Sequence, residues 1–175
     1  MRAIVYEGAG GIDVVRIVER PTPEPAPGQI RVRVRAAGLN RADILQRRGH
    51  YPAPPGWPAD IPGLEYAGEV ESLGAGAGRF SIGDRVMGLV GGGGQAEFVV
   101  IPEGEALRVP DGIDWPAAAA IPEAFLTAYD ALMTRGRLRA GERVLIHAAA
   151  GGIGTAAVQV ARRSGLIWSS GLVSD

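Results

Sequence analysis

Residues 143–163 have the sequence RVLIHAAAGGIGTAAVQVARR, and this stretch decides the fold of the C-terminal part of the chain. Its first five residues form a short apolar run of the kind found in a buried parallel strand. A loop of small residues follows from Ala148 to Gly154, and a helical pattern runs from Thr155 to Arg163. A strand, a glycine-rich loop and a helix in this order predict the opening unit of a doubly wound nucleotide-binding domain.

The loop between this strand and this helix has the composition that a pyrophosphate requires. Small residues at positions 148, 151 and 154 approach the spacing of the dinucleotide-binding fingerprint, with alanine in place of the first glycine. They allow a phosphate to approach the backbone, where the N–H groups and the dipole of the following helix favour its charge. The alternative is a tight turn that binds no ligand. The residues predicted to contact a cofactor here are Ala150, Gly151, Gly152, Ile153 and Gly154.

The residues before Asp114 predict a β-rich domain. Short β-branched runs alternate with glycine-rich turns, and the first two runs form a hairpin pattern. Asn40 can cap a short helix over residues 41–47. Many short strands joined by glycine turns favour a compact, partly open barrel. Strands are expected over residues 3–6, 12–18, 30–34, 66–73, 85–90 and 95–101.

Three arginines alternate with apolar residues in one of these strands. Ile30, Val32 and Val34 define a buried face, because side chains in a strand point alternately to opposite sides. The arginines at positions 31, 33 and 35 therefore lie on the other face, which we expect to be solvated. A basic ligand site built from them is the less favoured interpretation, because the charge of the chain is balanced.

Composition excludes several classes of function. The 175 residues carry a net charge of −1, so nothing favours a nucleic acid or an anionic membrane as a partner. The absence of cysteine excludes disulfides and thiolate-bound zinc, and two histidines are too few for a histidine-rich metal site. No apolar run has the length of a membrane span, and no signal peptide is evident. A cytoplasmic protein without a metal is expected.

In addition to the loop, four segments that precede it in the sequence match motifs of a known family. They are Asn40–Tyr51 (NRADILQRRGHY), Ile61–Gly68 (IPGLEYAG), Gly91–Glu97 (GGGGQAE) and Ala118–Ala124 (AAAIPEA). Together they resemble the zinc-free quinone oxidoreductases of the medium-chain dehydrogenase/reductase superfamily, and in particular the stress-inducible branch. The resemblance extends from Met1 to about Arg163.

This resemblance implies a mixed α/β fold and a two-domain organisation. Residues 1–122 would form the catalytic domain, with a GroES-like, partly open β-barrel. Residues 123–175 would form the truncated start of a Rossmann dinucleotide-binding domain. In zinc-binding relatives a cysteine and a histidine stand where this chain has Asn40 and Leu64, which is consistent with a zinc-free member.

The family's activity is the transfer of a hydride from NADPH to a quinone, and its full-length members are usually homo-oligomers. By resemblance, Asn40, Asp43 and Tyr51 are predicted catalytic residues beside the nicotinamide and substrate, with Asn40 also contacting the cofactor. Thr127 matches a further cofactor contact. Alternatively, Asn40 is only a helix cap, Asp43 a solvated first-turn carboxylate, Tyr51 a residue packed on the proline loop and Thr127 an ordinary helix residue. Glu65 is expected to be structural.

The resemblance stops after Arg163. Residues 164–175 contain no lysine or arginine to bind a ribose 2′-phosphate, and we expect no further strand from them. The strand near Val144–Ile146 would then leave an apolar surface exposed, which favours association. Two other functions stay open: an enoyl or alkenal reductase on the same scaffold, and a non-enzymatic barrel fragment.

Overall fold

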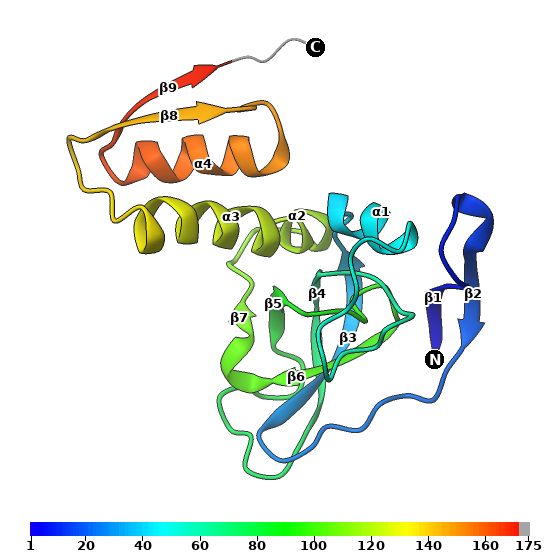
Figure 1. The fold of residues 1–175 in the computed structure, drawn as a ribbon. Coiled ribbons are helices and arrows are strands. Elements are labelled where there is room, and N and C mark those ends of the chain that lie inside the picture. The colour runs from blue at the N-terminus through cyan, green and yellow to red at the C-terminus, as the bar shows by residue number, and fades with distance from the viewer. Residues whose placement is uncertain (172–175) are drawn as a thin grey trace. The chain divides into compact units, whose positions relative to one another are not determined.

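The computed structural model describes residues 1–171, which fall into two compact units, Met1–Pro122 and a unit that begins at Glu123 (Figure 1). In the first unit the strands are β1 (Arg2–Tyr6), β2 (Val15–Glu19), β3 (Gln29–Ala37), β4 (Glu65–Leu73), β5 (Arg85–Leu89), β6 (Phe98–Pro102) and β7 (Leu107–Arg108). Its helices are α1 (Arg41–Arg47) and α2 (Trp115–Ala119), with 3₁₀ turns at Ile12–Val14 and Glu103–Glu105.

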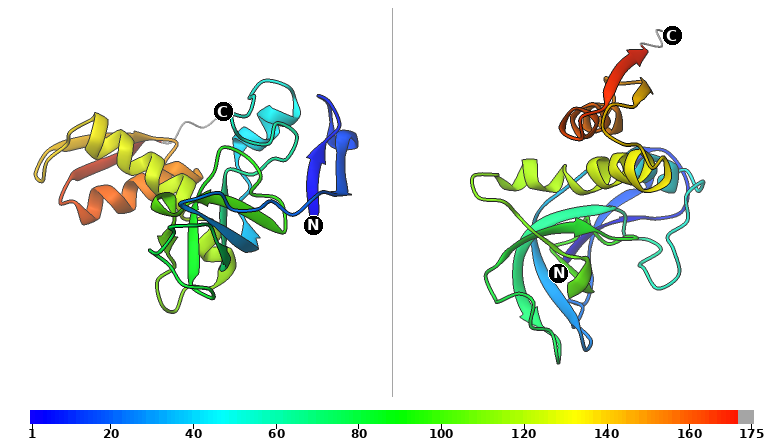
Figure 2. Two further views of the ribbon diagram at one scale, coloured as in Figure 1. Left: turned by 90° about the horizontal axis from the view of Figure 1, so that it is seen from below. Right: turned by 90° about the vertical axis from the view of Figure 1, so that its left-hand side faces the viewer.

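The centre of the first unit is a five-stranded antiparallel sheet in the order β6-β3-β4-β5-β7. Its strands curve around a core, and the edge strands β6 and β7 are not paired with each other (Figure 2). The expected partly open architecture is therefore confirmed, as a partial sheet rather than a closed barrel. The largest fully buried side chains of this core are Ile30, Val32, Tyr66, Val70, Val86 and Ile101.

The predicted hairpin and the first helix are both confirmed. β1 and β2 pair antiparallel from Arg2 opposite Glu19 to Tyr6 opposite Val15. The second strand starts later than expected, because Ile12–Val14 forms a 3₁₀ turn that closes the loop through Gly11. Helix α1 has the expected bounds, with Asn40 at its N-cap.

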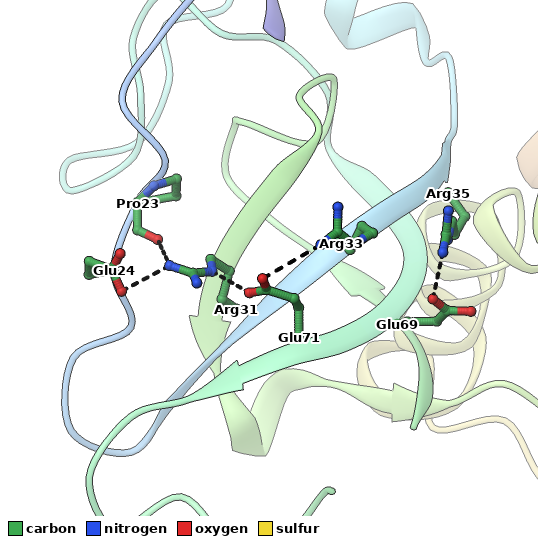
Figure 3. Close-up of polar contacts among 7 residues, drawn as sticks. All are labelled: Pro23, Glu24, Arg31, Arg33, Arg35, Glu69 and Glu71. Carbon is green, nitrogen blue, oxygen red and sulfur yellow. Dashed lines mark hydrogen bonds and ion pairs between the residues drawn. The ribbon is translucent and has the colours of Figure 1, made fainter. Parts of the chain in front are cut away.

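The three arginines of β3 form a ladder of ion pairs with glutamates of neighbouring segments (Figure 3). Arg31 lies 2.7 Å from Glu71 and 2.9 Å from Glu24, and its side chain is only 13% exposed. Arg35 lies 2.8 Å from Glu69. The solvated face expected for all three arginines is therefore wrong for Arg31, and no basic ligand site is formed, because the glutamates compensate these charges.

The second unit contains most of α3 (Pro122–Tyr129), a π-helical segment (Asp130–Arg135), β8 (Arg143–His147), α4 (Gly152–Arg163) and β9 (Ile167–Gly171). Helix α4 begins three residues earlier than predicted, with Gly151 at its N-cap. The cause is Gly154: a Cβ there would clash with the carbonyl oxygen of Ala148, so its absence lets the first turn pack directly on the loop. Thus Gly152–Gly154 belong to the helix and not to the loop.

The expectation that no strand follows Arg163 is wrong. β9 pairs parallel to β8, from Arg143 opposite Ile167 to His147 opposite Gly171. Since helix α4 connects these two parallel strands, the three elements form a βαβ unit. Helix α4 buries Ala156, Ala157 and Ala161 in a cluster that includes Ile146.

An apolar surface is exposed in this unit, and of the expected stretch Val144–Ile146 it includes Leu145 but not Ile146. Ile146 is only 7% exposed, because it packs in the cluster with α4. Leu145, Ile167 and Trp168 are 57%, 54% and 40% exposed.

Among the described residues, no helix is long and apolar enough to cross a membrane.

Candidate functional site

A pocket of about 460 Å³ lies beside helix α1 in the first unit. β1 contributes its last residue, Tyr6, and the segment that follows β3 contributes Leu39. A backbone hydrogen bond joins the loop after β1 to the end of α1, since the N–H of Gly10 donates to the carbonyl of Arg47 at 2.8 Å. The remaining lining residues are the N-cap and one face of α1: Asn40, Arg41, Asp43, Ile44 and Arg47.

Asn40 lines this pocket, and its amide is fixed by a buried carboxylate. Its Nδ2 donates a hydrogen bond of 2.9 Å to Oε1 of Glu65, a residue that is 3% exposed. Gly38 makes room for this contact, because a Cβ there would clash with the Glu65 side chain. Asn40 is therefore both the helix N-cap and a pocket residue, and Glu65 positions it.

Asp43 also lines the pocket but is 4% exposed, so it is not a solvated first-turn carboxylate. Its Oδ2 accepts a hydrogen bond of 2.7 Å from the Asn40 N–H, and its Oδ1 accepts one of 3.2 Å from the Gly63 N–H. Burial raises the pKa of the Asp43 carboxyl, and these two backbone donors oppose that shift. Asp43 thus joins α1 to the loop before β4.

Tyr51 is 39% exposed and is not among the residues that line the pocket. The aromatic residue of the pocket is instead Tyr6, from a strand that the sequence motif does not include. Arg47 is another pocket residue that the sequence did not predict, as are Leu39, Arg41 and Ile44. Its signal was available, because residues 40, 43, 44 and 47 have the spacing that places side chains on one face of a helix.

The glycine-rich turn of the second unit forms a separate candidate site. Ala148 adopts a left-handed conformation with φ of 51°, and its carbonyl accepts a 2.9 Å hydrogen bond from the Gly151 N–H. Gly151, Gly152 and Ile153 are exposed, and Ala150 is exposed as well. The first N–H groups of a helix have no partner within the helix, so the start of α4 presents donors to a ligand.

Thr127 lies in α3, in the second unit. Its hydroxyl donates a hydrogen bond of 3.5 Å to Oε1 of Glu123, one helical turn earlier. This contact matches an ordinary helix residue, and a cofactor contact from Thr127 stays a prediction.

Leu64 is buried at 7% exposure, and residues 1–171 contain no group of three side chains suited to a metal ion.

Comparison with known proteins agrees with this architecture. Residues 26–111 match the model of the alcohol dehydrogenase GroES-like domain. Over 160 residues the chain is 41% identical to the synaptic vesicle membrane protein VAT-1 homolog-like of Mus musculus, in an alignment that covers 91% of this chain and 38% of that relative.

Two solved structures are similar in fold as well as in sequence. The quinone oxidoreductase from Thermus thermophilus, solved also in complex with NADPH, is 44% identical with a TM-score of 0.83, over 99% of this chain and 54% of that one. The CurK enoyl reductase is 29% identical with a TM-score of 0.86, over 97% of this chain and 53% of that one. The chain thus spans about half, or less, of the length of these relatives.

Proposed function

Because this chain belongs to the medium-chain dehydrogenase/reductase superfamily, we propose that it forms part of an NADPH-dependent reductase of quinones. The similarity to quinone oxidoreductases supports an oxidoreductase, and the two candidate sites supply what such an enzyme requires. One is a turn suited to the cofactor's pyrophosphate, and the other is a pocket with polar and apolar walls suited to a small organic acceptor.

The observation that carries the proposal is the open backbone at Gly152. A Cβ built on Gly152 would meet no atom within 4 Å, so a ligand can approach the main chain there. Exposed N–H groups at the start of α4 would donate to the phosphate oxygens, with the helix dipole favouring their charge. The residues present therefore fit a pyrophosphate, and cofactor contacts are proposed for the exposed residues Ala150 to Ile153, while the buried Gly154 lets the helix pack on the loop.

Hydride transfer to the acceptor depends more on the orientation of the two reactants than on acid–base catalysis. When bound, the nicotinamide supplies the hydride, and the protein orients the two reactants. Asn40, fixed by Glu65, is the proposed contact for a polar group of substrate or cofactor in the α1 pocket. Asp43 acts through its backbone contacts as a positioning residue, and Tyr51 stays a proposed substrate contact from its resemblance to the family motif.

The preference for NADPH over NADH is the finer part of the proposal. Residues 164–171 hold no basic side chain, and β9 instead contains the hydroxyl residues Ser169 and Ser170. The choice of NADPH is supported by the similarity to the Thermus thermophilus enzyme, which was solved with NADPH. An enoyl reductase is the second candidate function, favoured by the similarity to CurK enoyl reductase.

A titration of NADPH into the 175-residue chain tests the proposal, with nicotinamide fluorescence as the signal. We expect saturable binding, and then faster NADPH oxidation with 1,4-naphthoquinone than with an enoyl thioester. The reverse order of rates would favour the second candidate. A chain with a folded circular dichroism spectrum that leaves NADPH fluorescence unchanged would contradict both.

A further inference from the structure

The α1 pocket holds two cationic side chains that no carboxylate compensates. Arg41 and Arg47 both line it, and neither forms an ion pair within residues 1–171. This separates them from the β3 arginines, which glutamates neutralise. The one carboxylate of the pocket, Asp43, directs both oxygens at backbone N–H groups. The pocket therefore carries excess positive charge.

The Arg47 guanidinium also has a hydrogen-bond donor without an acceptor. Its Nε is buried and has no hydrogen-bond partner. A buried donor without a partner is rare in folded proteins and costs free energy, so such a group calls for an explanation. The N–H at Nε is one of the donors that a guanidinium uses to bind a carboxylate in the bidentate manner.

Tyr6 brings an aromatic ring and a hydroxyl to the same place. Burial raises the pKa of the Tyr6 phenol, the charge of Asp43 raises it further, and Arg47 lowers it. The phenol is thus protonated at neutral pH and can donate a hydrogen bond. Tyr6, Asp43 and Arg47 all line this pocket.

Two further residues of the pocket wall are apolar. Leu39 is 85% exposed and Ile44 is 46% exposed, so both present hydrocarbon surface to a ligand. A site with an aromatic ring, two aliphatic side chains and one cationic corner matches a flat, unsaturated molecule that carries an oxygen at one end.

We propose that Arg47, assisted by Tyr6, binds the oxygen of a planar ligand in the α1 pocket, and that a carboxylate oxygen binds more tightly than a neutral carbonyl. Both kinds of oxygen accept hydrogen bonds from a guanidinium, and the carboxylate adds the attraction of opposite charges. The proposal deepens the proposed function, on which it rests for the identification of this pocket as the acceptor site, by assigning the residue that selects the acceptor.

Binding to the 175-residue chain without cofactor tests this by calorimetric titration of three probes: 2-naphthoate, 1,4-naphthoquinone and 2-methylnaphthalene. The chain has no cysteine and no lysine, so the quinone is not lost to thiol or lysine adducts. We expect Arg47→Gln to weaken 2-naphthoate by about ten-fold or more, as the loss of a charge-assisted hydrogen bond implies. Arg47→Lys should restore part of this affinity. Tyr6→Phe should weaken the binding of 2-naphthoate and 1,4-naphthoquinone, but by a smaller factor than Arg47→Gln does.

Arg48→Gln is the matched control, because it removes the same charge from an exposed neighbour outside the pocket. It should change each affinity by less than about two-fold, and 2-methylnaphthalene should be insensitive to all the variants. Equal effects of Arg47→Gln and Arg48→Gln would overturn the proposal, as would a wild-type chain that binds no 2-naphthoate at millimolar concentration. No NADPH is present in these titrations. The probe affinities can therefore be interpreted even if the chain does not bind NADPH and the proposed function is wrong.

Discussion

Asn40 and Glu65 form a hydrogen bond of 2.9 Å between the amide nitrogen of one and a carboxylate oxygen of the other. The two residues come from different motifs, the N-cap of α1 and the first residue of β4. The side chain expected to face a ligand is therefore held by a buried acidic residue, and the sequence motif IPGLEYAG alone does not show this contact.

Removing this carboxylate should destabilise the first unit. We expect Glu65→Ala to lower the free energy of unfolding by about 1–3 kcal/mol, because it leaves the Asn40 amide without this acceptor. Glu69→Ala on the same strand is the control, since its pair with Arg35 is solvent-accessible and should contribute about 1 kcal/mol or less. Urea unfolding of both variants measures the difference, and equal losses would contradict the positioning role of Glu65.

The buried carboxyl of Asp43 should make stability depend on pH. Because burial raises its pKa above the ordinary value of 3.8, the folded state binds this proton more tightly than the unfolded state. Its favourable contribution is complete below pH 3.8 and is lost as the pH rises through the folded-state pKa. Because the lowered pKa values of Asp84 and Glu97 act in the opposite direction, the fall should appear in the difference between the wild type and Asp43→Asn, which cannot titrate, when urea unfolding is followed across the acidic range. Parallel profiles for the two proteins would refute the assignment.

Two alanine substitutions in one turn should have opposite consequences. Gly154→Ala introduces a clash with the Ala148 carbonyl, so we expect a loss of about 1–3 kcal/mol of stability. Gly152→Ala meets no atom within 4 Å, so stability should change by less than about 1 kcal/mol, while NADPH affinity falls because the methyl group occupies the path to the backbone. Thermal unfolding and NADPH titration separate these effects. Unchanged NADPH affinity in Gly152→Ala would count against a pyrophosphate at this turn.

The alanine that replaces the first fingerprint glycine should be a point of strain. Ala148 has φ of 51°, in the left-handed region that costs a residue with a Cβ about 1–2 kcal/mol. Ala148→Gly should therefore stabilise the second unit by up to about 1 kcal/mol, after the greater flexibility of glycine in the unfolded chain is taken into account. A lower melting temperature for this variant would show that the loop holds Ala148 without strain.

Arg31 should contribute more to stability than Arg35, although both are arginines of β3 paired with glutamates. Arg31 is 13% exposed and bonds to the Pro23 carbonyl at 3.0 Å besides its two carboxylate partners, so it holds the proline-rich segment on the sheet. We expect Arg31→Ala to cost about 1–3 kcal/mol and Arg35→Ala about 1 kcal/mol or less. Chemical denaturation of both at low and high salt gives the comparison, and equal losses would contradict it.

Several elements were determined by the sequence itself, because each depends on local chemistry. The period of two in IRVRV defines the buried face of β3, and Asn40 begins a helix whose bounds were predicted correctly. The strand, glycine turn and helix of the second unit follow from an apolar run and from residues small enough to let backbone groups approach.

Only the tertiary structure decided which side chains meet. Tyr6 and Arg47 line one pocket although 41 positions separate them in the sequence, and Tyr51, the aromatic residue of the motif, lies outside it. The partners of Arg31 and the burial of Asp43 likewise depend on segments brought together by folding. β9 was missed because its residues have no strong strand pattern of their own, and their pairing comes from β8 beside them. Local pattern fixes an element, whereas a site depends on long-range contacts that no short stretch of sequence encodes.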